Sequence, residues 1–304
     1  MSAAAREGPD ERPADARGAP LDPVLAAALA TDIRAALAED VGDGDRTGQL
    51  LDPGTRVDAQ LIVREPAILC GRPWFDGVLR QVDPRLRVEW LFAEGASLES
   101  GARVCRLHGP ARGLLTAERA AMNFLQLLSA VATATRRYVE AVAQVPGNRA
   151  RILDTRKTLP GLRLAQKYAV RVGGGCNQRL GLYDAILIKE NHIAAAGGIT
   201  AAIERARAFA PHLADTLEVE VRDGAEIDEA LAAGAPRLLL DNMSTAELRD
   251  AVARAAGAAT LEASGGVTLA NLRETALTGV DFVSIGAITH SAPSLDLSLI
   301  LEAV

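Results

Sequence analysis

The spacing of apolar and polar residues divides the chain into two parts that differ in rhythm. The first part opens with an amphipathic helix predicted over residues 21–40, which ends at a Gly-rich turn. Residues 114–145 contain no Gly or Pro and are rich in Ala and Leu, so they predict one long, largely buried helix. Between the two helices, short alternating segments predict strands of a small sheet around residues 58–69, 86–92 and 103–108. The pattern predicts an α+β domain over residues 21–145.

After Pro146 short apolar strands alternate with helical stretches. The predicted strands are Arg151–Asp154, Ala185–Lys189, Leu217–Val221, Arg237–Asp241, Thr260–Ser264 and Phe282–Gly286. The predicted helices are Leu162–Val172, Thr200–Ala210, Ala225–Ala233, Thr245–Ala256 and Leu269–Leu277. Such alternation implies parallel strands with crossover helices. Because six strands are clear rather than eight, we expect an open, incomplete α/β barrel over residues 146–290. We expect residues 291–304 to return to the N-terminal domain.

Composition narrows the class of protein. The net charge of −6 argues against a general nucleic-acid binder, which would usually be basic. No run of 18 apolar residues exists, so we expect no membrane span, and residues 1–20 lack the apolar core of a signal peptide and predict a disordered tail. The three cysteines, Cys70, Cys105 and Cys176, are widely spaced and odd in number, which fits a reducing cytoplasm better than a disulfide framework.

The cations are distributed unevenly. Of 33 Lys and Arg residues only Lys157, Lys167 and Lys189 are lysines, and all three lie in one short stretch. From Arg149 to Lys189 nine cationic residues face only two acids, although the whole chain is acidic. A charge run is usually a solvated face. Here the cations are interleaved with Gly and apolar strand residues, which favours a pocket.

Nearly every predicted strand of the second part ends in polar or Gly residues, where a βα barrel places its chemistry. The period of a strand puts Glu218 and Glu220 on one face, so both carboxylates point into the lumen if the other face packs on helices. They either pair with lumen cations or act in the reaction, and one network can do both. Asp241 is a second acid at a strand end. It could simply cap the next helix, but Ser244 lies closer to that helix and suits the cap better. Such acids could hold sugar hydroxyls or a divalent cation, or stabilise positive charge on a sugar carbon.

Two Gly turns follow the last two strands. Ser264, Gly265 and Gly266 are expected to open directly into a helix near Thr268, and Gly286 and Ala287 follow the final strand. Glycine lets backbone N–H groups approach an anion closely, and a helix N-terminus adds partial positive charge. Together they predict a phosphate site.

Residues 154–193, DTRKTLPGLRLAQKYAVRVGGGCNQRLGLYDAILIKENHI, resemble the quinolinate phosphoribosyltransferase family, the carboxylating nicotinate-nucleotide pyrophosphorylases. EDVGDGDRT, LTAERAAMNFLQLLSAVAT, LEVEV, LLLDNM, EASGGV and SIGAITHSAPSLDLSL match in order across nearly the whole chain after residue 20. The resemblance implies an N-terminal α/β sandwich domain, a C-terminal open α/β barrel and a homodimer or larger oligomer. It implies that quinolinate and phosphoribosyl pyrophosphate react with Mg²⁺ to give nicotinate mononucleotide, pyrophosphate and CO2.

The same resemblance implies roles for individual residues. Thr155, Arg156, Lys157, Gln178 and Arg179 would bind quinolinate, with Arg119 reaching in from the neighbouring subunit. Lys189, Glu218 and Asp241 would line the sugar, pyrophosphate and metal region, with Glu218 and Asp241 as candidate Mg²⁺ ligands. Ser264 to Gly266, with Gly286 and Ala287, would hold the 5′-phosphate. The resemblance thus implies that the residues acting directly in the reaction are Lys157, Lys189, Glu218 and Asp241.

The chain departs from the family pattern at Gln178, where the family commonly has His. Glutamine keeps a hydrogen-bond donor but cannot carry a proton or positive charge. We expect Gln178 to be a neutral contact to a substrate carboxylate. We expect structural roles for Thr158, which would shape its turn, and for Lys167 and Arg171, which would lie on a helix. For His192 a loop hydrogen bond is at least as plausible as a catalytic role.

Three other readings stay open at this point. Lys189 could be the Schiff-base nucleophile of an aldolase, which borohydride trapping would detect. A related molybdenum-transport-associated protein would keep the fold and change the acceptor, although the intact TRKTLPGLR and IKENH segments favour quinolinate. A nucleotide-binding relic without turnover is supported only by Gln178.

Overall fold

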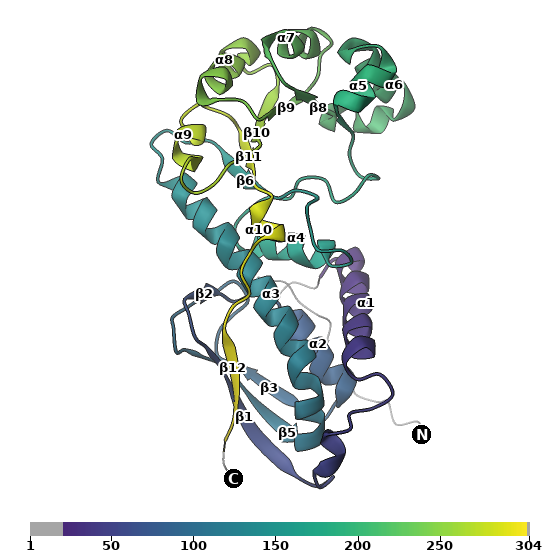
Figure 1. Cartoon of the computed structure of the whole chain (residues 1–304), viewed down its shortest axis with the longest axis vertical. Coiled ribbons are helices and arrows are strands. Elements are labelled where there is room, and N and C mark those ends of the chain that lie inside the picture. The colour runs from purple at the N-terminus through teal and green to yellow at the C-terminus, as the bar shows by residue number, and fades with distance from the viewer. Residues whose placement is uncertain (1–20, 303–304) are drawn as a thin grey trace, which may run out of the picture. The chain divides into compact units, whose positions relative to one another are not determined.

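The computed structural model describes residues 21–302 of the chain, so the tail predicted over residues 1–20 lies outside the described residues. Residues before Ala134 and those from Pro293 onward form one unit, and Ala134–Ala292 form the other. The division falls inside the long helix α3 (Ala111–Ala143), rather than at the predicted boundary after residue 145. Figure 1 shows the order of the elements along the chain.

The first unit contains a four-stranded antiparallel sheet in the order β12-β1-β5-β3. Its strands are β1 (Arg56–Val63), β3 (Arg87–Trp90), β5 (Arg103–Pro110) and β12 (Leu297–Leu301). Alternate residues of β1, namely Ala59, Leu61 and Val63, are buried, as the predicted alternation requires. β12 pairs with β1 from Val63 to Ala59, so the last strand of the chain belongs to the sheet of the first unit.

Helices pack against one another and against this sheet within the first unit. They are α1 (Pro23–Asp40), α2 (Arg72–Val82) and α3, with the short helix η1 (Gly48–Leu50) and the strand pair β2 (Ala67–Ile68) and β4 (Ser97–Leu98). α1 buries Leu25, Leu29 and Ile33, and Asp32 accepts a 2.9 Å hydrogen bond from the indole of Trp74. The sequence analysis missed α2 because Gly71 and Pro73 resemble a break, although proline in the first turn is typical of a helix start.

The second unit is built on six parallel strands in the order β6-β11-β10-β9-β8-β7. Their bounds are β6 (Arg151–Leu153), β7 (Leu187–Ile188), β8 (Glu218–Val221), β9 (Arg237–Asp241), β10 (Thr260–Ser264) and β11 (Phe282–Ser284). β6 and β7 are the two edges of the sheet, so the barrel is open, as predicted.

Helices connect the strands and lie outside them in Figure 1. They are α4 (Arg163–Val172), α5 (Glu190–Ala196), α6 (Ile199–Phe209), η2 (Pro211–Thr216), α7 (Gly224–Ala232), α8 (Thr245–Ala255), α9 (Leu272–Ala276) and α10 (Ala287–His290). Ser244 caps α8 as predicted. The expectation of a helix starting near Thr268 is wrong: the Asn271 side chain accepts from the Thr268 N–H in a turn, and α9 starts at Leu272.

The two faces of the parallel sheet differ in chemistry. Residues that alternate along the strands on one face are apolar and buried: Val219, Val221, Leu238, Leu240, Leu261, Ala263 and Val283. The register of neighbouring strands gathers ionisable groups on the other face, including Glu218, Arg237 and Glu262. The helices therefore cover an apolar face, and the face toward the lumen carries the charge. Among residues 21–302 no helix has the length and apolarity that crossing a bilayer would require.

Candidate active site

Most of the predicted site residues lie where strands of the second unit end. Thr155, Arg156 and Lys157 follow β6, Lys189 follows β7, and Asp241 ends β9. Ser264 ends β10, and Gly286 follows β11. Because all six strands are parallel, these ends share one edge of the sheet, which we call the carboxyl edge.

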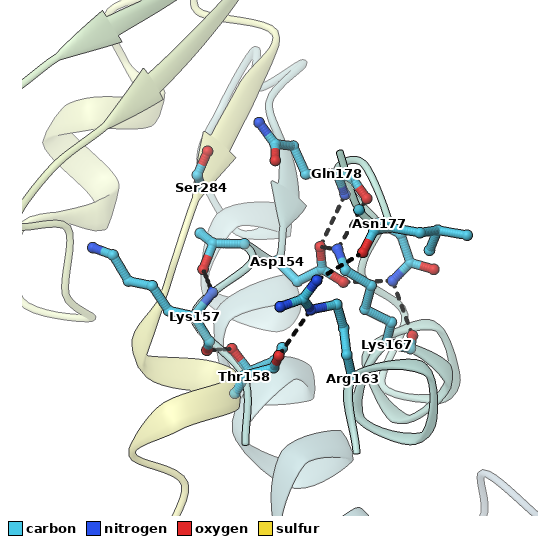
Figure 2. A network of polar contacts seen from close by, with 12 residues as sticks. Asp154, Lys157, Thr158, Arg163, Lys167, Asn177, Gln178 and Ser284 are labelled. Atoms are coloured by element: carbon cyan, nitrogen blue, oxygen red, sulfur yellow. Dashed lines mark hydrogen bonds and ion pairs between the residues drawn. The ribbon is translucent and has the colours of Figure 1, made fainter. Parts of the chain in front are cut away.

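A buried ion pair fixes the segment that carries Gln178 and Arg179 (Figure 2). Asp154 is fully buried and accepts hydrogen bonds from the ammonium of Lys167, from Nδ2 of Asn177 at 2.6 Å and from the backbone N–H of Gln178 at 2.9 Å. The Lys167 ammonium also donates to the carbonyl of Gln178 at 2.9 Å. Burial raises the pKa of Asp154 and lowers the pKa of Lys167, and their mutual attraction opposes both shifts. We call this group the Asp154 cluster; in it Lys167 is structural, as predicted.

A tight turn after the Asp154 cluster presents Arg156 and Lys157. The hydroxyl of Thr155 accepts from the N–H of Lys157 at 3.0 Å, and the N–H of Thr158 donates to the carbonyl of Arg156 at 3.0 Å. The hydroxyl of Thr289 donates to the carbonyl of Lys157 at 2.7 Å. Figure 2 shows the Lys157 side chain extending away from this turn. The backbone is thus held at both ends while the ammonium stays free to meet a ligand.

Three cations of the site have no counter-ion. Arg156, Lys157 and Arg179 make no side-chain hydrogen bond or ion pair with any residue in 21–302. The Nε atoms of both arginines are also shielded from solvent. Burial lowers the pKa of Arg179, and the charge of Arg156 lowers it further. Arg156 and Arg179 are partly buried and Lys157 is exposed, and three unpaired cations of this kind form a site for an anion.

The carboxylate beside Lys189 is Glu220 rather than Glu218. Glu220 forms an ion pair with the Lys189 ammonium, whose side chain is 44% exposed. Glu218 is the first residue of β8, two residues farther from the carboxyl edge, and is buried. Its Oε2 accepts from Nε2 of Gln178 at 3.2 Å. The strand period predicted both acids on one face, and the structure adds that Glu220 is the one paired with Lys189.

Asp241 and the first Gly turn are joined by Asn242, which the sequence analysis missed. Nδ2 of Asn242 donates to the Asp241 carboxylate at 3.0 Å, and its backbone N–H donates to the carbonyl of Ser264 at 2.9 Å. Gly265 has φ +97, and a β-carbon there would lie 2.1 Å from Oδ1 of Asn242. Only glycine therefore allows this turn to approach Asn242 so closely. Asn242 itself has a positive φ of 56°, a backbone feature that sequence spacing does not reveal.

The second Gly turn packs against Lys157. A β-carbon on Gly286 would lie 3.2 Å from Cδ of Lys157 and 3.3 Å from Nε2 of His290. Gly286 and Ala287 begin the four-residue helix α10. The structure therefore brings the lysine of the β6 turn to the turn after β11, which suits a ligand that carries phosphate next to other negative groups.

A cavity of about 440 Å³ lies on the lumen side of the same sheet. Its lining includes Gln178, Arg179, Glu218, Arg237 and Phe282. This size is within the range of small-molecule sites. Arg237 and Phe282 were missed because each is the first residue of a strand, where sequence reasoning looked only at strand ends.

Two predicted features are placed elsewhere or not formed by the protein alone. Arg119 lies on α3 in the first unit, where it is exposed and has no hydrogen bond or ion pair with residues 21–302. Within the described part of the chain, no group of three or more His, Cys, Asp and Glu side chains is arranged to hold a metal ion. His192 accepts from the N–H of Lys189 at 3.0 Å, so it makes a backbone hydrogen bond as one of its two predicted roles required, but it lies in the first turn of α5 rather than in a loop.

Comparison with known proteins gives a consistent result. Residues 45–129 match the family described as quinolinate phosphoribosyl transferase, N-terminal domain, and residues 131–300 match its C-terminal domain. Nicotinate-nucleotide pyrophosphorylase [carboxylating] of Mycobacterium leprae is 44% identical over 277 residues, covering 88% of this chain and 95% of the relative. The probable enzyme of the same name from Synechocystis is 42% identical, covering 86% and 89%. The structure of nicotinate-nucleotide pyrophosphorylase from Francisella tularensis superposes with a TM-score of 0.87 at 43% identity, covering 91% and 96%.

Proposed function

The chain belongs to the quinolinate phosphoribosyltransferase family, and we propose that it transfers phosphoribose from phosphoribosyl pyrophosphate to quinolinate with loss of CO2. The products are nicotinate mononucleotide, pyrophosphate and CO2, a step of NAD biosynthesis. The curated relatives that it matches over almost their whole length are named for this chemistry.

The observation that carries the proposal is the set of unpaired cations Arg156, Lys157 and Arg179. Quinolinate has two adjacent carboxylates, and its partner carries a phosphate and a pyrophosphate. Charge-assisted hydrogen bonds from arginine contribute about 1.5–3 kcal/mol each, so a site with several of them favours a polyanionic substrate pair. An aldolase would need fewer anion sites, and here Lys189 is already engaged by Glu220.

The chemistry follows from the substrates and the residues. The pyridine nitrogen attacks the anomeric carbon while the bond from that carbon to pyrophosphate breaks, and the ring becomes a pyridinium. The pyridinium then accepts the electron pair of the breaking C–C bond as CO2 leaves, and the ring carbon takes a proton. Glu220 and Asp241 at the carboxyl edge supply negative charge for the positively charged sugar. Lys157 and Lys189 stabilise the departing pyrophosphate.

The remaining contacts with the phosphate groups and with Mg²⁺ come from the Gly turns and from the acids. Backbone N–H groups of Ser264 to Gly266 and of Gly286 and Ala287 hold the 5′-phosphate. Mg²⁺, when bound, would neutralise pyrophosphate charge. Asp241 and Glu220 would be its protein ligands, because both lie at the carboxyl edge, whereas Glu218 begins β8 and is paired with Arg237. A site with few carboxylates fits this ion, because Mg²⁺ is usually held by one or two carboxylates together with substrate phosphates and water.

We further propose a homodimer that works in the cytoplasm, with Arg119 completing the neighbour's site. Arg119 supports this because it is exposed and has no partner in residues 21–302. All three cysteines are free, as a reducing compartment requires. Mixing an inactive Arg119→Met variant with an inactive Lys157→Met variant should restore part of the activity only if subunits share sites.

The direct test incubates the protein with quinolinate, phosphoribosyl pyrophosphate and Mg²⁺ and measures CO2 and nicotinate mononucleotide. We expect both products in equal amounts. Arg156→Met should remove most of the activity, while Arg171→Met, an exposed arginine on α4 outside the site, should leave it unchanged. The absence of both products from a folded, dimeric protein would overturn the proposal.

A further inference from the structure

A second group of charges lies on the lumen face, deeper than the carboxyl edge. Nη2 of Arg237, the first residue of β9, lies 3.7 Å from Oε1 of Glu218 on β8 and 3.6 Å from Oε2 of Glu262 on β10. The side chain of Glu262 is 1% exposed, and its other oxygen accepts from the hydroxyl of Ser284 on β11. We call these four residues the Arg237 cluster.

The Arg237 cluster contains two carboxyls and one cation. Burial raises the pKa of Glu262, the negative charge of Glu218 raises it further, and the Ser284 hydroxyl and Arg237 oppose these shifts. Glu262 is therefore a carboxyl that keeps a proton more readily than an ordinary glutamate. Glu218 lines the cavity together with Gln178, Arg179 and Arg237, so its charge faces the ligand.

The other groups around Glu218 do not replace Arg237. Gln178 donates one N–H to it but brings no positive charge. Arg179 feels the negative charge of Glu218, which counteracts part of the lowering of its pKa by burial. Arg151 on β6 stacks on Phe282 at 5.9 Å, as Arg237 does at 5.5 Å, but forms no ion pair with a carboxylate of residues 21–302. The cation that directly opposes Glu218 therefore comes from β9.

We propose that Arg237 is a positioning residue that neutralises Glu218, so that Arg179 and the second N–H of the Gln178 amide stay available to a dicarboxylate substrate. The inference rests on the proposed function and deepens it, because it assigns a determinant of quinolinate binding outside the carboxyl edge. Without Arg237, Glu218 would turn toward Arg179 and would repel the incoming carboxylates.

The proposal predicts a selective loss in the Arg237→Gln variant. The KM for quinolinate should rise roughly ten- to hundredfold near pH 8, because truncating one partner of a buried charge pair is costly. The KM for phosphoribosyl pyrophosphate should change by less than about threefold, since a factor of ten corresponds to a whole contact of about 1.4 kcal/mol.

Two further variants test whether Arg237 acts through its pairing with Glu218 or through a general attraction for anions. Arg151→Gln removes a cation on the same ring but leaves Glu218 its partner, so its quinolinate KM should rise less than that of Arg237→Gln. Arg237→Lys, which keeps the charge and folds more safely, should stay within about fivefold of wild type.

Failure of this inference can be told from failure of the proposed function. If wild type turns over but Arg237→Gln keeps its quinolinate KM, the role of Arg237 is overturned and the function stands. The free energy of unfolding without substrate gives a readout independent of turnover. It should be lower in Arg237→Gln than in Arg237→Lys, and equal values would overturn the charge pairing even in a protein that lacks the proposed activity.

Discussion

Two of the three lysines of the chain, Lys167 in the Asp154 cluster and Lys157 at the carboxyl edge, have opposite surroundings. Lys167 is 1% exposed, and its ammonium is bonded both to Asp154 and to the carbonyl of Gln178. Lys157 is exposed, its side chain has no partner among residues 21–302, and its backbone alone is fixed. The charges of the Asp154 cluster are paired, whereas at the carboxyl edge, where Lys189 pairs with Glu220, Lys157 is left unpaired among residues 21–302.

The difference shows how the backbone of the site is fixed while a charged side chain stays free to bind a ligand. A buried charge without a partner is expensive, so the Asp154 cluster orders the segment carrying Gln178 and Arg179 only because its hydrogen bonds are complete. An exposed lysine tolerates the absence of a partner and keeps its binding free energy for a ligand. Removing a charge from the two regions should therefore produce different losses, one of stability and the other of activity.

The largest effect is expected from Lys167→Met. Asp154 would be left as an unpaired buried carboxyl, so the free energy of unfolding should fall by about 3–5 kcal/mol. Urea denaturation followed by circular dichroism measures it. Arg171→Met on the same helix is the matched control and should change stability by no more than about 0.5 kcal/mol. A loss under about 1 kcal/mol for Lys167→Met would mean that the Asp154 cluster does not hold this part of the fold.

The opposite result is expected from Lys157→Met. Its turnover should fall about 10²–10³-fold, roughly 2.7–4 kcal/mol of transition-state stabilisation, because a positioned charge at the reacting group is lost. Its free energy of unfolding should stay within about 0.5 kcal/mol of wild type, since the side chain is exposed. Steady-state kinetics and urea denaturation on the same preparation test both statements. A variant that lost stability and kept turnover would reverse the comparison.

Gly265→Ala tests how closely the carboxyl edge is built. An alanine there would have a strained positive φ and a β-carbon in contact with Asn242, at a cost of roughly 1–3 kcal/mol. We expect the KM for phosphoribosyl pyrophosphate to rise about tenfold or more, since about 1.4 kcal/mol is a factor of ten. Gly266→Ala is the control: its φ is +61 but nothing lies within 4 Å of the added carbon, so it should have a smaller effect. Equal effects would show that backbone conformation alone matters.

The smallest effect concerns Glu262, which is buried like Lys167 but has one oxygen without a hydrogen bond in residues 21–302. Its pKa is raised in the folded protein, so between the ordinary carboxyl pKa and the raised value the folded state binds more protons than the unfolded state. Stability due to this group is therefore lost as pH rises through that window. Glu262→Gln lacks the titration, and we expect its stability relative to wild type to increase as pH rises above the ordinary carboxyl pKa. Parallel stability curves would contradict the raised pKa.

Much of the fold was predictable because it follows from hydrophobic spacing. The six parallel strands, the open barrel and the long helix α3 were all expected from apolar runs and the absence of Gly and Pro. α2 and α5 were missed, and α9 starts later than expected. Local spacing also does not determine which strands pair, so the pairing of β12 with β1 is a result of tertiary structure.

The site was predictable only where chemistry coincides with a strand end. Lys157, Lys189 and Asp241 were found in this way, and the structure places all of them at the carboxyl edge. Depth along a strand was not readable, so the strand period alone could not show that Glu220 rather than Glu218 pairs with Lys189. Arg237 and Glu262 lie on the adjacent strands β9 and β10, and their pairing depends on the strand register, which cannot be deduced from the sequence.

The pairing of β1 with β12 also has a consequence for how the chain is made. Ala59 lies opposite Leu301, and Arg64 bonds to Ser298 across 234 positions. During synthesis the sheet of the first unit therefore cannot be completed until almost the entire chain has been made. Until then β1 is an edge strand that can pair with other chains. A chain truncated before Leu297 would therefore leave the edge of β1 permanently exposed.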